Sequence, residues 1–252
     1  MTTLNFSGKR VLITGGSGDI GHALSDAFAR HGADVAFTFF MNHEGKRKTE
    51  AAIEASGQRA LSIRANLRDR NACTEIANTV VNAWGGVDIF ISNAATGVLK
   101  PAMQTKDKHW DATMDVNATS FLSLTRLLAP HMSPGGRVMA MSSAGSVKAI
   151  ENYALIGASK AALESLVRHL AMELGPKGIT VNALSPGVVD TRALQHFPNR
   201  EQLISIATMR TPNGRLVTPA DVAEVALLIA SPLAGQIQGQ TIVIDGGYSI
   251  LA

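Results

Sequence analysis

The 252-residue sequence is poor in several residue types, and each shortage excludes a class of protein. A single cysteine, Cys73, excludes an internal disulfide and fits a reducing compartment. Aromatic residues make up only 5% of the chain, so aliphatic side chains must fill its core. No apolar run approaches the ~18 residues of a membrane span, and no basic-then-apolar leader opens the sequence. We therefore expect a cytoplasmic protein without a membrane span.

The net positive charge and a pI near 9.2 raise the hypothesis of a nucleic-acid partner, but the basic residues are scattered along the sequence. The net charge is only +3, and the densest basic run, residues 46–48, lies between Glu44 and Glu50. We expect no nucleic-acid binding and no metal site. Two interpretations stay open for four arginines: they attract an acidic carrier protein over a distance, or they form an ordinary solvated surface. These are Arg192, Arg200, Arg210 and Arg215.

Apolar runs and helical patterns alternate along the whole chain. Several runs are near-continuous in Val, Ile, Phe and Met, which is typical of strands buried on both faces of a parallel sheet. The predicted strands are Arg10–Thr14, Asp34–Phe39, Arg59–Ala65, Val87–Ser92, Gly136–Met141, Ile179–Leu184 and Gln240–Asp245. The predicted helices lie near 20–31, 43–56, 69–84, 107–132, 152–174 and 219–230. The alternation predicts an α/β fold, a Rossmann-like doubly wound sheet of about seven parallel strands with helices on both faces, as one domain over residues 1–252.

Only the last predicted helix has a clear start signal, and the segment before it has little pattern. Thr218 is the expected N-cap, Pro219 the first helical residue and Asp221 the capping-box acid. Ligands of such sheets bind beyond the carboxyl ends of the strands, so the segment at about 188–215 is a predicted substrate lid. Its apolar residues suit an acyl chain, or form an amphipathic helix packed on the core: Leu194, Phe197, Leu203, Ile204, Ile206 and Met209.

A glycine-rich turn, residues 15–21, joins the first predicted strand to the first helix. Such a turn tolerates positive φ, lets the backbone approach a pyrophosphate, and aims free helix N–H groups at the anion. The turn predicts a dinucleotide site, with a purely structural turn as the alternative. After the second strand there is no carboxylate until Glu44, so nothing repels a 2′-phosphate, and Lys46 or Arg47 can reach it. The sequence therefore favours NADPH over NADH.

Motifs spread over the whole chain resemble those of the short-chain dehydrogenase/reductase superfamily. They are Thr14-Gly15-x3-Asp19-x-Gly21, Asn93-Ala94-Ala95, Asn117, Ser142-Ser143, Tyr153 with Lys160, and Ser185-Pro186-Gly187. Most members carry Tyr-x3-Lys, but position 156 is isoleucine here, and Tyr153 and Lys160 give Tyr-x6-Lys. That spacing is similar to the enoyl-acyl-carrier-protein reductases of the superfamily, most closely the third type (FabL).

The spacing also has a physical meaning. A seven-residue helical step turns ~700° and rises ~10.5 Å, whereas a four-residue step rises only ~6 Å. Both side chains then share a helix face, but Tyr153 is displaced along the helix from Lys160. Ketone reduction delivers hydride to the carbon that bears the protonated oxygen. Reduction of an α,β-unsaturated thioester delivers it to Cβ, while charge develops on a carbonyl oxygen further along. A displaced tyrosine suits the second reaction.

The resemblance implies a role for each of four candidate catalytic residues. Lys160 binds the nicotinamide ribose and lowers the pKa of the Tyr153 phenol. Tyr153 stabilises the enolate oxygen of the substrate. Ser143 polarises the substrate carbonyl, or caps its own turn. Asn117 holds a water or backbone bond behind Lys160, or is an ordinary helical asparagine.

The resemblance also implies the cofactor contacts and a homo-oligomer, a tetramer. The contacts are Gly15, Ser17, Gly18, Asp19, Ile20, Gly21, Phe39, Asn66, Leu67, Asn93, Ala94, Lys160, Pro186, Gly187, Val189 and Thr191. Two of them depart from the family pattern. Asp19 replaces a usual glycine and puts a carboxylate near the pyrophosphate. Asn66 stands where many relatives have an aspartate that reads adenine, and an amide can still hydrogen-bond the ring.

Three functions follow from these features. The first is NADPH-dependent reduction of trans-2-enoyl thioesters, on acyl carrier protein or coenzyme A, in fatty-acid-type synthesis. The second is a carbonyl or 3-oxoacyl reductase, or a dehydrogenase, of the same superfamily. The third is a dinucleotide-binding protein without catalysis, and the intact pair of Tyr153 and Lys160 argues against it.

Overall fold

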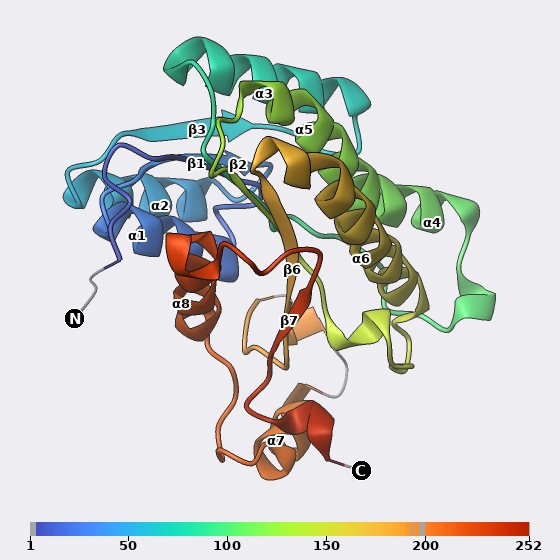
Figure 1. Cartoon of the computed structure of the whole chain (residues 1–252). Coiled ribbons are helices and arrows are strands. Elements are labelled where there is room, and N and C mark those ends of the chain that lie inside the picture. Colours follow the sequence, from blue (N-terminus) through green and yellow to red (C-terminus); the bar gives the residue numbers. More distant parts are fainter. Residues whose placement is uncertain (1–3, 193, 197–199, 252) are drawn as a thin grey trace.

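Seven parallel strands form one sheet in the order β3-β2-β1-β4-β5-β6-β7 (Figure 1). The structure is a computed structural model that describes residues 4–192, 194–196 and 200–251. The strands are β1 (Arg10–Ile13), β2 (Asp34–Phe39), β3 (Ala60–Arg64), β4 (Ile89–Ser92), β5 (Arg137–Met141), β6 (Thr180–Pro186) and β7 (Thr241–Ile244). The strand order reverses between β1 and β4, and in such sheets this is where ligands bind, beyond the carboxyl ends.

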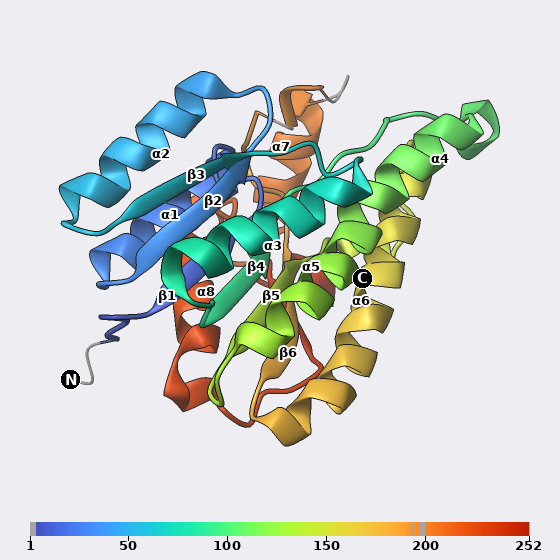
Figure 2. The same ribbon diagram turned by 90° about the horizontal axis from the view of Figure 1, so that it is seen from above.

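Helices cover both faces of the sheet, as Figures 1 and 2 show. One face carries α3 (Arg70–Trp84), α5 (Ser120–Leu128) and α6 (Ala154–Leu174), and the other carries α1 (Asp19–Arg30), α2 (His43–Ala55) and α8 (Pro219–Ala230). The helix α4 (Asp107–Met114) leads into α5, and α7 (Arg200–Arg210) lies near the C-terminal turn at Tyr248–Ile250 (Figure 1). None of the helices in the described ranges combines the length and apolarity needed to cross a bilayer.

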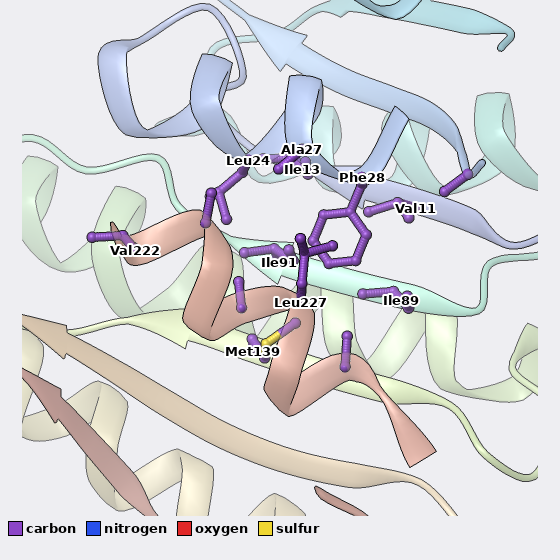
Figure 3. Packing of buried hydrophobic residues seen from close by; sticks show 14 of the residues in the cluster. Val11, Ile13, Leu24, Ala27, Phe28, Ile89, Ile91, Met139, Val222 and Leu227 are labelled. Carbon is purple, nitrogen blue, oxygen red and sulfur yellow. The ribbon is translucent and has the colours of Figure 1, made fainter. Parts of the chain in front are cut away.

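The core consists of two layers that the alternation of side chains along each strand creates. In β1, Val11 and Ile13 point to the layer under α1 and α8, whereas Leu12 points to the layer under α3, α5 and α6. All three are fully buried, which explains why the strands read as continuous apolar runs. Figure 3 shows Phe28 of α1 and Leu227 of α8 meeting over the first of these layers.

The predicted strands and most predicted helices are confirmed, with bounds that shift by one or two residues. The capping box at Thr218 and Asp221 is present, and α8 begins at Pro219. Three details differ. The predicted helix 107–132 is interrupted by a π-helical segment at Asp115–Thr119 and ends in a 3-10 turn, and α6 begins two residues later than predicted. The helix α7 lies in the predicted lid, for which a helix is one of two interpretations.

The Phe28 ring tests the assignment of the core. Phe28 is fully buried and has an edge-on contact with Phe6. Phe28→Ala removes that ring without a replacement, so we expect a loss of about 3–5 kcal/mol in the free energy of unfolding, measured by urea denaturation. Phe40, which is 43% exposed, provides the control, and Phe40→Ala should cost less than about 1 kcal/mol. Equal losses in the two variants would contradict this core.

Candidate active site

The glycine-rich turn forms a cradle that no side chain fills. A Cβ at Gly21 would lie 2.2 Å from the carbonyl oxygen of Gly15, so only glycine permits this close approach of the backbone. Helix α1 begins with Gly18 as its N-cap, and among the described residues no side chain caps it. The first amides of α1 are therefore available to an anion, together with the positive end of the helix dipole. These features fit a dinucleotide pyrophosphate.

Two threonines and one asparagine fix this turn to the neighbouring strands. The Thr14 hydroxyl oxygen accepts from the backbone amides of Asn93, at 3.0 Å, and Ala94, at 3.1 Å. The Asn93 side-chain amide donates back to the carbonyls of Thr14 and Gly15. The Gly15 amide donates to the Thr38 hydroxyl at 3.0 Å. Asn93 therefore holds the end of β4 against the turn.

The other predicted cofactor residues follow strand ends at the same edge of the sheet. Phe39 ends β2 and Leu67 lies beyond β3, and both are buried, while Asn66 is exposed and accepts from the Arg68 amide. Pro186 ends β6, and the following residues run past the sheet edge: Gly187, Val189 and Thr191. The sheet thus brings the predicted set together.

The end of β2 offers little free positive charge. Lys46 forms an ion pair with Glu50 at 2.6 Å, one turn further along α2, whereas Arg47 is exposed. The Asn42 side chain is occupied as well, because it caps α2 at the Gly45 amide and donates to the Ser17 carbonyl. Of the two residues predicted to reach a 2′-phosphate, Arg47 is the one that forms no ion pair within the described part of the chain.

Three consecutive residues at the end of β5 bond to three side chains of the α6 segment; we name these contacts the β5–α6 seam. The Lys160 ammonium donates to the carbonyl of Met141 at 2.7 Å. The Ser142 hydroxyl donates to the Glu164 carboxylate at 2.5 Å. The Tyr153 hydroxyl lies 3.5 Å from the Ser143 hydroxyl oxygen. The seam thereby collects Ser143, Tyr153 and Lys160, three of the four predicted catalytic residues.

Tyr153 does not belong to the helix that carries Lys160. Helix α6 begins at Ala154, Tyr153 is its N-cap with φ −113° and ψ 8°, and Asn152 before it has a positive φ of 60°. The prediction that one regular helix places both side chains is therefore wrong for the tyrosine. Its ring instead packs on Gly145, where a Cβ would approach within 2.6 Å of ring carbons. A turn and a close contact, rather than helix geometry, place the phenol.

Asn117 lies in the π-helical segment between α4 and α5 and joins two parts of the site. Its side chain accepts from the Thr96 amide at 2.8 Å and donates to the Thr96 carbonyl and to the Ser159 hydroxyl. It is 1% exposed. π-Segments occur frequently at functional sites, and this one presents the asparagine to the loop after β4 and to α6 together. Asn117 is thus bonded to the backbone of Thr96 and, on the other side, to Ser159, the residue before Lys160.

Burial shifts the pKa values of both main candidates. It lowers the pKa of Lys160 to about 8, since an ammonium is costly in an apolar interior. It also raises the pKa of the Tyr153 phenol, and the hydrogen bond with Ser143 only partly offsets this. The predicted lowering of the Tyr153 pKa is therefore wrong in direction. A phenol with a raised pKa stays protonated at neutral pH and can donate its hydrogen.

Ile156 occupies the position that carries the tyrosine in the usual four-residue spacing. A Cβ at Gly97 would lie 2.2 Å from Cγ1 of Ile156, so this side chain packs directly on the backbone of the loop after β4. The same loop is bonded to Asn117 through Thr96. Position 156 thus presents an apolar group where most of the superfamily has a phenol.

The predicted lid contains a short helix, and its arginines are not a free basic patch. Arg192 pairs with Asp19 and Arg200 with Asp190, while Arg215 pairs with Asp221 and Arg210 lies over the Tyr248 ring. Of the predicted apolar lid residues, Leu194 is buried, Ile204 and Ile206 are half-buried, and Met209 is 76% exposed. Phe197 and the side chain of Leu203 lie outside the described residues.

Sequence analysis missed the role of Glu164. This carboxylate is buried and accepts from the Ser142 and Ser146 hydroxyls. It stands four residues after Lys160, one helical turn along, so the spacing was a usable signal. The serines that satisfy it come from a distant segment, which no local pattern reveals.

The chain matches the model of a protein family over most of its length. The family is described as enoyl-(acyl carrier protein) reductase, and its model matches residues 16–249. Among curated relatives, 1-cyclohexenylcarbonyl-CoA reductase of Streptomyces collinus is 35% identical over 96% of this chain and 87% of its own length.

Solved structures resemble this one closely. A short-chain dehydrogenase from Burkholderia cenocepacia in complex with NADP has a TM-score of 0.90 and 33% identity, over 97% of this chain and 99% of that one. A 7α-hydroxysteroid dehydrogenase in complex with NADH and 7-oxo glycochenodeoxycholic acid has a TM-score of 0.90 and 31% identity, over 97% of this chain and 95% of that one.

Gly21 and Gly18 give a matched pair of substitutions in the turn. A methyl at Gly21 overlaps the Gly15 carbonyl, whereas one at Gly18 keeps an ordinary 3.4 Å contact with the same atom. Gly21→Ala should therefore reduce the free energy of unfolding by about 1–3 kcal/mol and weaken dinucleotide binding, and Gly18→Ala should leave the free energy of unfolding nearly unchanged. Urea denaturation and fluorescence titration measure the two effects. An alanine tolerated at Gly21 would contradict the close approach of its Cα to the Gly15 carbonyl.

The buried ammonium predicts a pH-dependent stability. Lys160 has a pKa of about 8 when folded, against 10.5 for an ordinary lysine, so between these values the unfolded chain binds a proton that the folded chain does not. The cost of burying the charge is complete below pH 8 and disappears as the pH rises to 10.5. Relative to Lys160→Met, the unfolding free energy of the wild type should rise by about 3 kcal/mol over that range.

Urea denaturation of both proteins at pH values from 7 to 10.5 measures this difference. Lys177→Met is the control, because Lys177 is exposed, and its difference from the wild type should not depend on pH in the same way. A flat difference for Lys160→Met would mean that the ammonium is not desolvated.

Proposed function

This chain belongs to the short-chain dehydrogenase/reductase superfamily, in the family described as enoyl-(acyl carrier protein) reductase, and from that premise we propose that it reduces trans-2-enoyl thioesters with NADPH. The product is the saturated acyl thioester. Its relatives include reductases and dehydrogenases of several kinds, so membership establishes a nicotinamide-dependent oxidoreductase, and the substrate is our proposal.

One observation carries the proposal: the phenol precedes α6 at Tyr153, and Ile156 takes the place of the usual tyrosine. The acceptor carbon of a conjugated thioester is apolar and separate from the oxygen that gains charge. An apolar isoleucine is compatible with the acceptor carbon. A phenol displaced from Lys160 is able to donate to the thioester oxygen. The name of the Streptomyces relative supports this, since 1-cyclohexenylcarbonyl-CoA has its double bond next to the thioester carbonyl.

In this proposal each of the four candidate catalytic residues has one task. Lys160 holds the nicotinamide ribose hydroxyls with its buried ammonium, and Tyr153 donates its hydrogen to the thioester oxygen as enolate charge develops. Ser143 keeps the phenol oriented, and Asn117 fixes α6 to the loop after β4. When bound, NADPH supplies the hydride. The turn at 15–21 holds its pyrophosphate.

The remaining parts of the proposal concern cofactor choice, carrier and assembly. No acid follows β2 directly and Arg47 is exposed, which favours the 2′-phosphate of NADPH over NADH. The segment 188–215 is proposed to cover the acyl chain as a lid. Acyl carrier protein or coenzyme A as the carrier, a tetramer and a cytoplasmic location stay predictions of the sequence.

A carbonyl reductase is the second candidate, and Ser143 favours it. A serine hydroxyl 3.5 Å from the phenol is able to polarise a substrate carbonyl, and the 7α-hydroxysteroid dehydrogenase of similar structure is complexed with a 7-oxo compound. In that reaction the phenol must donate its hydrogen to the oxygen on the same carbon that receives the hydride. Substrates that differ only in this respect separate the two candidates.

Crotonyl and acetoacetyl thioesters provide that comparison. With NADPH we expect oxidation of the cofactor with the crotonyl thioester, little with the acetoacetyl thioester, and slower turnover with NADH, followed at the absorbance of the reduced cofactor. Tyr153→Phe should lower kcat about 100-fold or more, because the oxyanion loses its donor, without weakening NADPH binding. The only other tyrosine supplies the control, since Tyr248→Phe keeps the ring under Arg210 and should retain activity. Turnover of acetoacetyl thioester alone would replace the proposal by the second candidate.

A further inference from the structure

Arg192 of the segment after β6 is bonded to the glycine-rich turn. Its backbone amide donates to the Asp19 carboxylate at 2.6 Å, and its Nε donates to the other carboxylate oxygen at 3.1 Å. Its Nη2 donates to the carbonyl of Ser17 at 3.2 Å. These three bonds join residues 173 or more positions apart in the sequence, and they hold the guanidinium on the turn that fits the pyrophosphate.

The carboxylate of Asp19 creates an electrostatic problem at this place. It lies in the first turn of α1, at the helix end where an anion binds, and contributes a full negative charge. The positive end of a helix dipole amounts to only about half an elementary charge. Without a compensating cation the turn would be net negative and would repel a pyrophosphate. Arg192 restores a net positive charge.

The guanidinium also keeps donors for a ligand. Arginine has five N–H groups, and the bonds to Asp19 and Ser17 use the Nε group and one on Nη2. Three N–H groups remain, in the planar arrangement that suits phosphate oxygens. Arg192 is 52% exposed, so these groups are not enclosed by the protein.

We propose that Arg192 binds the pyrophosphate of the dinucleotide and that Asp19 is the positioning residue that holds it there. Asp19 alone would repel the pyrophosphate, but paired with Arg192 it positions a cation for it. This explains a carboxylate where the family usually has glycine. The pair also ties the 188–215 segment to the cofactor site. The inference rests on the nicotinamide cofactor of the proposed function but not on the enoyl substrate, so a binding measurement tests it separately.

The test is a double-mutant cycle on the dissociation constant of NADPH, measured by fluorescence titration of the full-length protein. Arg192→Ala should weaken binding about 10- to 100-fold, because a charge-assisted bond is lost and Asp19 is left uncompensated. Asp19→Gly should have a small effect, since it removes both the holder and the repulsion. The double variant should bind at least five-fold more tightly than Arg192→Ala. ADP-ribose, which shares the pyrophosphate, should lose affinity by the same factor as NADPH.

Arg200→Ala is the matched control, since Arg200 forms an ion pair with Asp190 in the same segment and, within the described ranges, makes no hydrogen bond or ion pair with the turn. It should leave the dissociation constant within about two-fold, as expected for an ion pair remote from the ligand. The proposal is overturned if Arg192→Ala changes affinity less than three-fold, or if removing Asp19 does not restore binding. An equal loss in Arg200→Ala also overturns it, because the effect would then come from the segment as a whole.

Discussion

The seam between the end of β5 and the α6 segment is the interaction on which the site depends. Its most demanding member is the bond from the Lys160 ammonium to the Met141 carbonyl, because Lys160 is 4% exposed and, in the described part of the chain, has no carboxylate within ion-pair distance. A buried cation without an acid is costly, and the lowered pKa expresses that cost. The apolar contacts that pack α6 on the sheet offset this cost and keep the lysine buried.

The neighbouring bonds of the seam fix the position of the loop that supports the Tyr153 ring. Glu164, one turn beyond the lysine, holds Ser142 and Ser146, and the segment between them contains Ser143 and Gly145, on which the Tyr153 ring rests. The phenol is thus located by the loop and not by α6 itself. A shift of that loop would move the hydrogen donor while leaving the lysine in place. This separation allows one fold to serve oxygens at different distances from the cofactor.

Sequence patterns predicted the sheet and most helices well, because each depends on local order. The runs that became β1 and β5 contain unbroken buried apolar segments, Val11–Ile13 and Val138–Met141, and the capping box at Thr218 is complete within four residues. Where pattern failed, distant contacts decide the structure. The π-segment around Asn117 is fixed by bonds to Thr96 and Ser159, and Tyr153 leaves the helix because Asn152 adopts a positive φ beside a loop. The link from Arg192 to Asp19 joins residues 173 positions apart in the sequence.

The central claim is that the seam holds a phenol where it serves the oxygen of a conjugated thioester, so that hydride enters at the far end of the double bond. Transfer of deuterium from NADPH labelled at the nicotinamide C4 to a crotonyl thioester tests this most directly, with the label located by NMR of the butyryl product. The account predicts deuterium at C3 and a solvent proton at C2. Deuterium at the thioester carbon or at C2 would contradict it.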